Sequence, residues 1–243
     1  ESPIHTYYKL RAAFEQAEFQ PRVVVLPVDL HTFSSFRAER LDDQDPAFWS
    51  QYVDYLEVGR EQGDWFPMAV ERAKVEFAYL GGLDDVLGIL FPSEPWEVAD
   101  MQRGYAPDYE NFANWTAEEQ LDQAEERIAK HLEGSQVVDP LMVTYMGRLL
   151  DLLEEHDVQV VLVWYPITEL YADLADERVS VNGHFAAMQS LFADRSNILW
   201  LDYHDLFWGH PEYFSDSDHL NVDGAQIFTE RFVQDLRKNG VGW

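Results

Sequence analysis

Three short apolar runs constrain the fold most strongly, because each one is strand-like and helix-like patterns separate them. The runs are VVVLPV at residues 23–28, VQVVLVWYP at residues 158–166 and NILWLDY at residues 197–203. Short runs rich in β-branched residues are typical of buried strands. Strands that alternate with helices favour a parallel sheet covered on both faces. The sequence therefore predicts an α/β protein with three layers, α/β/α, around a flavodoxin-like parallel sheet.

Helix signals fill the intervals between these runs. Thr116 and Glu119 form a capping-box pattern, and Asp139 before Pro140 is typical of an N-cap followed by the first helical residue. Asn221 is placed to cap a last helix that ends near residue 238. Further helices are predicted at residues 3–19, 46–63, 66–80 and 180–195, and an irregular loop at residues 92–115. The chain is thus predicted to form one domain, 1–243, with a helical insertion at about 36–135.

Charge and composition narrow the classes of partner. The chain has 45 Asp and Glu against 17 Lys and Arg, a formal net charge of −28, which repels nucleic acid and anionic membranes. No apolar run reaches the ~18–20 residues of a membrane span. The absence of Cys excludes disulfides and thiol catalysis but fixes no compartment. Acid-rich, Lys-poor surfaces are typical of proteins from salt-accumulating organisms, and a simply soluble acidic protein is the alternative.

The loop after the third run carries the densest chemistry, in the stretch YFSDSDHLNVDG at residues 213–224. Asp216 lies three residues before His219, a spacing at which the carboxylate can reach the imidazole and fix its tautomer. Asp218 is expected to point elsewhere. A solvated acidic loop is the plainer alternative, and a calcium or zinc site fits the spacing less well. Neither a metal nor a cofactor is predicted.

The same stretch resembles the last conserved block of the SGNH (GDSL-type) hydrolase superfamily, which supplies a catalytic Asp and His as Asp-x-x-His. Asp216 and His219 fall on those positions. VVLVWYPITELY and NILWLDYHDLF are similar to the preceding strands in a branch that adds or removes acyl groups on cell-surface polysaccharides. The resemblance implies an esterase or O-acyltransferase acting on an ester of a carbohydrate or other small molecule. It also favours an extracytoplasmic location, periplasmic or at the cell surface.

The chain departs from the family at the nucleophile. The Gly-Asp-Ser-like block and the Gly of the second block have no match and by register would precede Glu1, while LPVDLH at residues 26–31 replaces the block with the oxyanion Asn. Asp29 and His31 stand there without an assigned role. Ser2, Ser34 and Ser35 are interpreted as loop or cap residues. We therefore expect the Ser nucleophile outside this chain, and the alternative is a non-catalytic binding or assembly protein on a degenerate SGNH scaffold.

Other polar and aromatic residues near the expected site have plain structural interpretations. His204 and His210 are predicted to be polar loop residues rather than substrate contacts. Aromatic residues at 96, 105, 109 and 115 either stack on sugar rings or pack a subdomain core. The substrate-binding residues and the oligomeric state stay unassigned.

The charge generates a first prediction. Self-repulsion between carboxylates is large at a net charge of −28, and the Debye length falls from about 10 Å at 0.1 M salt to about 3 Å at 1 M. The melting temperature of the chain should therefore rise over this range, as measured by circular dichroism in NaCl. A flat or falling curve would remove the interpretation of a salt-adapted protein.

Overall fold

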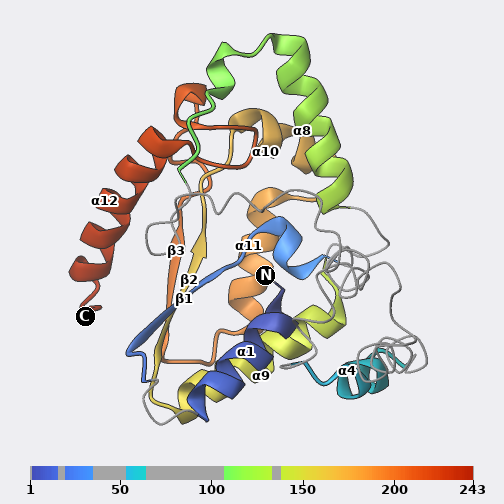
Figure 1. The fold of residues 1–243 in the computed structure, drawn as a ribbon, viewed down its shortest axis with the longest axis vertical. Helices are drawn as coiled ribbons and strands as arrows, with labels where there is room; N and C mark the ends of the chain where they lie inside the picture. The colour runs from blue at the N-terminus through green and yellow to red at the C-terminus, as the bar shows by residue number, and fades with distance from the viewer. Residues whose placement is uncertain (1, 16–19, 35–52, 64–106, 133–137, 243) are drawn as a thin grey trace, which may run out of the picture.

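The computed structural model describes residues 2–15, 20–34, 53–63, 107–132 and 138–242 (Figure 1). A three-stranded parallel sheet forms the centre, and its strand order is β1-β2-β3. Strand β1 is Val23–Pro27, β2 is Gln159–Trp164 and β3 is Ile198–Asp202. The register pairs Val25 with Val161, and Val161 with Leu199. All three predicted strands are confirmed, as is the α/β class.

Helices surround this sheet in the described ranges. Their bounds are α1 Pro3–Phe14, α4 Tyr55–Gln62, α8 Ala117–His131, α9 Pro140–Glu155, α10 Glu169–Asp176, α11 Val181–Leu191 and α12 Val222–Lys238. Short 3₁₀ turns lie at Leu30–Phe33, Phe112–Asn114 and Pro211–Tyr213.

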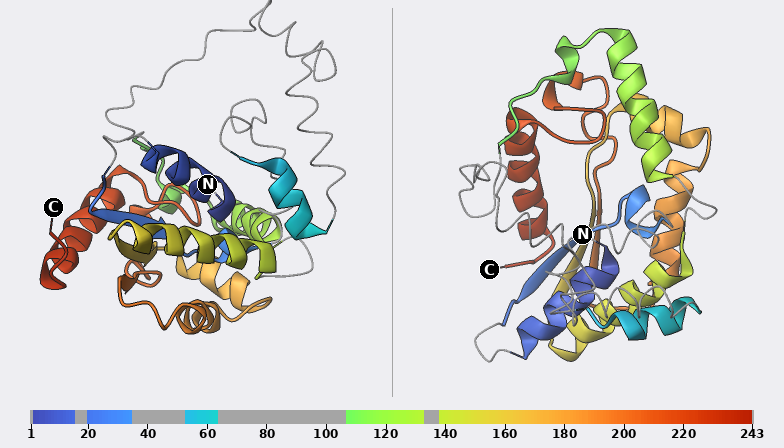
Figure 2. Two further views of the ribbon diagram at one scale, coloured as in Figure 1. Left: turned by 90° about the horizontal axis from the view of Figure 1, so that it is seen from below. Right: turned by 45° about the vertical axis from the view of Figure 1, so that its right-hand side comes forward.

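Strand β2 divides the molecule into two apolar sides because its side chains alternate between the faces of the sheet. Val160, Leu162 and Trp164 pack into the larger core with α1, α9 and α11. Val161 and Val163 face the opposite side, where side chains of α12 complete two smaller clusters. Figure 1 shows α12 on one side of the sheet and α1 and α9 on the other, and both views in Figure 2 agree. The predicted three-layer arrangement is therefore present.

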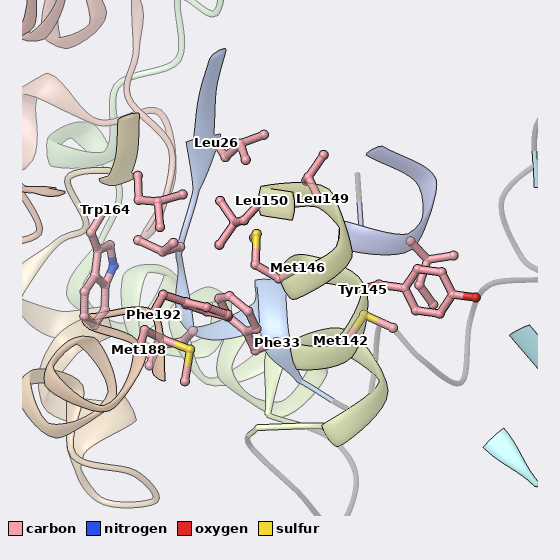
Figure 3. Packing of buried hydrophobic residues seen from close by; sticks show 14 of the residues in the cluster. Leu26, Phe33, Met142, Tyr145, Met146, Leu149, Leu150, Trp164, Met188 and Phe192 are labelled. Atoms are coloured by element: carbon pink, nitrogen blue, oxygen red, sulfur yellow. The ribbon is translucent and has the colours of Figure 1, made fainter. Parts of the chain in front are cut away.

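Helix α9 supplies much of the larger core. It begins at an Asp139 cap, whose carboxylate accepts from the Leu141 N–H at 2.8 Å, and Pro140 occupies the first turn. Its inner face carries buried side chains at helical spacing, which are Met142, Tyr145, Met146, Leu149, Leu150 and Leu153. Figure 3 shows several of these side chains meeting others from β1, β2 and α11. A β-strand face is thus covered by one amphipathic helix.

Polar contacts join α1, α4 and α9 at the edge of this core. The Tyr8 hydroxyl donates to Glu57 at 2.7 Å, and its oxygen lies 3.1 Å from that of Tyr145. Arg148 of α9 donates to Glu57 at 3.1 Å. Burial followed by these hydrogen bonds raises the pKa of Tyr8, which keeps the hydroxyl as a neutral donor.

The predicted helix signals can be compared with the structure element by element. The caps at Thr116, Asp139 and Asn221 are confirmed, with the full capping box at Thr116 and Glu119. The helix predicted at 180–195 is α11, which Ser180 caps. Helix α4 begins at Tyr55 with an Asp54 cap and not as one helix from residue 46, whereas its end at Gly63 is confirmed by a left-handed φ of 78°. No helix was predicted between β2 and residue 180, but Glu169–Asp176 forms helix α10 there.

The predicted helix at 66–80 and most of the predicted loop at 92–115 lie outside the described residues. The single domain and its insertion at about 36–135 stay predictions for the same reason. Within the described residues, no helix is both long and apolar enough to cross a bilayer.

The position of β2 generates a second prediction. Leu162 is fully buried in the middle strand, so Leu162→Ala removes contacts on all sides and leaves a cavity. We expect the free energy of unfolding to fall by about 2–5 kcal/mol, measured by urea denaturation. Leu191→Ala is the matched control, since that side chain is 52% exposed at the end of α11. Equal effects of the two substitutions would contradict the assigned core.

Candidate active site at the carboxyl edge of the sheet

A cavity of about 630 Å³ opens where the strands β1 and β2 end. Pro27 and Asp29 of the β1 end and Trp164 and Tyr165 of the β2 end form one side of it. The other side comes from His219 and its neighbours and from the first turns of α12, where Phe228 is part of the wall. Ligands of open α/β sheets bind at this edge, so the cavity is the natural place to look for chemistry.

The loop that carries His219 is held in one conformation by its own hydrogen bonds. Phe214 and Leu220 form an antiparallel bridge, and the Ser215 N–H donates to the His219 carbonyl at 2.9 Å. Asn221 caps α12 by accepting from the Gly224 N–H at 3.0 Å, while its amide donates to the carbonyls of Glu212 and Phe214. The hydrogen bonds of Asn221 therefore connect the loop to the N-terminus of α12.

Glycine is required at the first turn of α12. A Cβ on Gly224 would lie 2.1 Å from the Tyr213 carbonyl oxygen, far inside van der Waals contact. The close approach of helix and loop depends on the missing side chain. Asn221 and Gly224 thus have structural roles, in capping α12 and in allowing the loop to approach it closely.

Asp216 and His219 are in contact, as their spacing predicted. His219 Nδ1 lies 3.0 Å from both carboxylate oxygens of Asp216. The same carboxylate accepts from the backbone N–H groups of Asp218 at 2.9 Å and His219 at 2.8 Å. Four contacts therefore fix the carboxylate against the ring, and the His219 side chain is 58% exposed.

Helix α8 delivers a cation to this pair. Arg127 Nε donates to Asp218 at 2.8 Å and its Nη2 donates to Asp216 at 3.1 Å. Nη2 also lies 2.6 Å from His219 Nδ1 and 3.4 Å from His219 Nε2. The expectation that Asp218 points elsewhere was wrong, because its carboxylate is only 6% exposed and joins the same cluster. His131, one turn further along α8, lies 3.7 Å from Asp218 and 2.8 Å from the Tyr171 hydroxyl.

The pKa values follow from these contacts. Burial raises the pKa of Asp216, but the hydrogen bond and charge of His219, the Asp218 N–H and Arg127 outweigh it and hold the pKa at about 2. The hydrogen bond to Asp216 raises the pKa of His219 above its usual value, against burial and the charge of Arg127. Burial raises the pKa of Asp218, and the nearby Asp216 adds to the effect.

Three of these side chains also satisfy the distances of a small cation site. One ligand atom each from Asp216, Asp218 and His219 lies within 4.8 Å of the others. The guanidinium of Arg127 already contacts both carboxylates. A positive charge is therefore supplied to both carboxylates by the protein itself.

The other residues considered from sequence fall into two groups. Asp29 and His31 line the cavity, and the His31 ring stacks on His131 with 4.6 Å between centroids. Ser34 is buried and its hydroxyl donates to the His31 carbonyl at 3.0 Å, while Ser2 caps α1. Ser35 lies outside the described residues. Loop and cap roles are thus confirmed for Ser34 and Ser2.

The remaining His and aromatic candidates lie away from the cavity wall. His204 is buried and contacts Asp202 at 2.7 Å, and His210 is exposed with Glu212 at 3.0 Å. Trp115 packs on Phe112 in an apolar cluster and Tyr109 is exposed. The positions 96 and 105 lie outside the described residues.

Sequence reasoning missed Arg127, His131 and Tyr171. Arg127 lies 89 positions before Asp216, and the helix that carries it was read as part of the insertion. A usable signal was present, because Arg127 and His131 are four residues apart and share one face of α8. Their relation to the His219 loop appears only when α8 is docked.

The fold and the cluster define a class: a parallel α/β protein with an Asp–His pair and an arginine at the carboxyl edge of its sheet, beside a cavity. A protein-family model matches residues 109–240, more than half of the chain, and the chain belongs to that family. The matched range contains Arg127, Asp216 and His219, and it starts within the segment expected to be an insertion. No curated protein matches the sequence.

The depressed pKa of Asp216 generates a third prediction. Asp216→Asn should lower the free energy of unfolding by about 2 kcal/mol at pH 6, since the fold lowers the pKa of this carboxyl from its ordinary value of 3.8 to about 2. A carboxylate whose pKa is lower in the folded than in the unfolded state stabilises the fold at pH values above its unfolded-state pKa. The difference between the two proteins should therefore shrink as the pH falls from 4 toward 2.

Urea denaturation between pH 2 and pH 7 measures this difference. Asp194→Asn is the control, because Asp194 is exposed and has no hydrogen bond among the described residues. A difference for Asp216→Asn that is constant over this pH range would show that the carboxylate charge contributes nothing to the loop.

Proposed function

We propose that this protein acts as an SGNH-like esterase or O-acyltransferase, in which the pair of Asp216 and His219 activates a Ser nucleophile lying outside this chain. The observation that carries the proposal is the 3.0 Å contact between His219 Nδ1 and the Asp216 carboxylate, beside a cavity at the carboxyl edge of the sheet. A carboxylate, an imidazole and an adjoining cavity are the parts that nucleophilic acyl transfer needs in addition to the hydroxyl.

The proposed reaction moves one proton back and forth through His219. Nε2 takes the proton of the Ser hydroxyl as its oxygen attacks the acyl carbonyl carbon, and the tetrahedral intermediate then collapses as the leaving alkoxide receives that proton. Water or an alcohol then gives a proton to Nε2 as it attacks the carbonyl of the acyl-Ser. The second tetrahedral intermediate collapses with loss of the Ser oxygen, which takes the proton back from Nε2. Asp216 stabilises the imidazolium that forms in each half.

The nature of the cavity supports an uncharged ester as the substrate. Apolar side chains of Tyr165, Phe228 and Phe232 share its wall with Asp29 and His219. A wall of this kind holds an acyl group by burial and leaves polar groups to orient the ester. Water as acceptor gives hydrolysis and a sugar hydroxyl gives transfer, so the carbohydrate esters implied by the SGNH resemblance fit either outcome. That resemblance also supports an extracytoplasmic location.

A non-catalytic binding protein on the same scaffold is the second candidate, and one observation favours it. Among the described residues, the hydrogen bonds of the His219 ring go to Asp216 and Arg127 and none goes to a Ser hydroxyl. Ser34, the serine described in the loop after β1, has its hydroxyl engaged with the His31 carbonyl. A cavity without a nucleophile would bind an ester or oligosaccharide and leave it intact.

Turnover of acetyl esters separates the two candidates and forms the fourth prediction. The 243-residue chain should turn over 4-nitrophenyl acetate or an acetylated oligosaccharide only weakly, because His219 can deprotonate only a hydroxyl held within about 3 Å. A version extended upstream through a Ser block should be active. His219→Ala in that version should lower kcat by a factor on the order of 10³–10⁶.

His210→Ala is the matched control. His210 is 56% exposed and lies 3.0 Å from Glu212, so it reproduces the exposure and carboxylate contact of His219 at a distance from the cavity wall. An extended chain that binds acetylated oligosaccharide without turnover would favour the binding protein. Strong activity of the 243-residue chain that is lost in Ser34→Ala or Ser35→Ala would mean that the nucleophile is misplaced.

A further inference from the structure

We propose that the cavity beside His219 is an acyl-chain site, which binds an ester of an uncharged polar alcohol whose acyl group is about as long as octanoyl. The inference rests on the proposed function for its catalytic meaning and deepens it, because it names the acyl group that would be presented to His219. The binding itself is a property of the cavity wall, so it is measurable without turnover.

One face of α12 lines the cavity and leads away from His219. Ala225, Phe228, Thr229 and Phe232 belong to the wall, and their spacing places them on a single face of the helix. The hydroxyl of Thr229 donates to the Ala225 carbonyl at 2.7 Å, so the polar group of this face is satisfied within the helix. In Figure 1, α12 starts near the carboxyl edge of the sheet and runs back alongside the strands. The face therefore extends from the candidate catalytic pair along the side of the sheet.

Aromatic rings make this part of the wall apolar and keep its shape. The rings of Tyr165 and Phe228 have their centroids 5.5 Å apart, and the ring of Phe228 stacks on that of Phe232 with centroids 5.7 Å apart. Pro27 and Leu220 add further apolar surface to the same cavity. Each CH₂ group that leaves water for such a wall tightens binding by about two- to fourfold. The wall thus favours a ligand with several consecutive CH₂ groups.

The size of the cavity sets the length of the chain. Its volume is about 630 Å³, of which an acetyl group would fill only a small part. Ala225 and Phe232 are separated by about 10 Å along the helix axis at a rise of about 1.5 Å per residue. Three bonds of an extended chain span about 3.5 Å, so an extended octanoyl chain has a comparable length. An acyl carbon held near His219 would therefore carry an octanoyl chain along α12 as far as Phe232.

Polar groups gather in the part of the cavity that lies at the strand ends. They are the side chains of Asp29, His31, Tyr171, Asp218 and His219. Burial and then the charge of Asp29 raise the pKa of Tyr165, which keeps this hydroxyl as a neutral donor. Carboxylates accept hydrogen bonds from the hydroxyl groups of an uncharged alcohol, whereas they repel an anionic group, as does a chain with a net charge of −28. The charges of the cavity thus favour an uncharged polar head on the acyl chain.

Calorimetric titration of the 243-residue chain tests the site and forms the fifth prediction. The probes are N-acyl-N-methylglucamides from acetyl to decanoyl, below their micelle concentrations, because they share one uncharged polyol head and contain an amide in place of the ester. The acetyl compound should show no measurable binding. Affinity should rise by about two- to fourfold for each added CH₂ up to octanoyl and change little beyond it. Octanoate, which brings a negative charge to the carboxylates of the cavity, should bind more weakly than the octanoyl glucamide.

Two substitutions on α12 make the result specific to this wall. Thr229 is exposed and lines the cavity, so Thr229→Trp should fill the middle of the acyl-chain site while the helix stays intact. Binding of the octanoyl glucamide should weaken by about tenfold or more, and the gain per CH₂ should stop at a shorter chain. Gln234→Trp is the matched control, because Gln234 is also exposed on α12 but lies on the opposite face by helical spacing. Far-UV circular dichroism verifies that both variants are folded.

Three results would overturn the acyl-chain site. The first is an affinity that does not depend on chain length, and the second is an octanoyl affinity that Thr229→Trp leaves unchanged in a folded protein. The third is octanoyl binding by the 243-residue chain that disappears in the version extended upstream, because another segment of protein would then cover this wall.

Binding and turnover fail separately. In the extended version, kcat/KM for 4-nitrophenyl octanoate should exceed that for 4-nitrophenyl acetate, and Thr229→Trp should remove the difference. If the glucamides bind as expected but no form of the protein acts on esters, the proposed function fails and the acyl-chain site stands. If the extended version hydrolyses acetyl esters and gains nothing from a longer acyl group, the proposed function stands and the acyl-chain site fails.

Discussion

Strand β2 has no face left for water, and this constraint organises the rest of the molecule. Its side chains enter the large core beneath α9 on one face and the clusters beneath α12 on the other. Both neighbours of β2 are parallel to it, so the chain leaves all three strands at the same edge of the sheet. The burial of β2 between two parallel neighbours thus determines where the polar residues of the loops after the strands meet.

The candidate site is assembled at that edge by contacts far apart in the sequence. The loop of residues 214–220 is closed by its own bridge and by Asn221, which gives Asp216 and His219 a fixed spacing. Helix α8 then adds Arg127 across 89 positions of chain. Local hydrogen bonds supply the pair and tertiary docking supplies the cation, so the two parts of the cluster have different physical origins.

This difference explains what could be predicted from the sequence. The three strands and the caps of α8, α9 and α12 depend on short patterns, and the contact of Asp216 with His219 depends on a spacing of three residues. Helix α10 was missed because it is short and begins in a Pro-containing segment, where Thr168 gains a bond to the distant Ser217 carbonyl. Arg127 was missed because no local pattern reports a partner on a docked helix.

The strong acidity of the chain gives the cluster its electrostatic character. Basic residues number 17 against 45 acidic ones, yet Arg127 lies between two carboxylates that are 23% and 6% exposed. Salt screens exposed charges strongly and partly buried pairs much less. High salt can therefore relieve repulsion over the surface while it leaves the contact of Arg127 with the buried Asp218 in place. The surface carboxylates and the buried pair of Arg127 and Asp218 thus respond differently to the same ions.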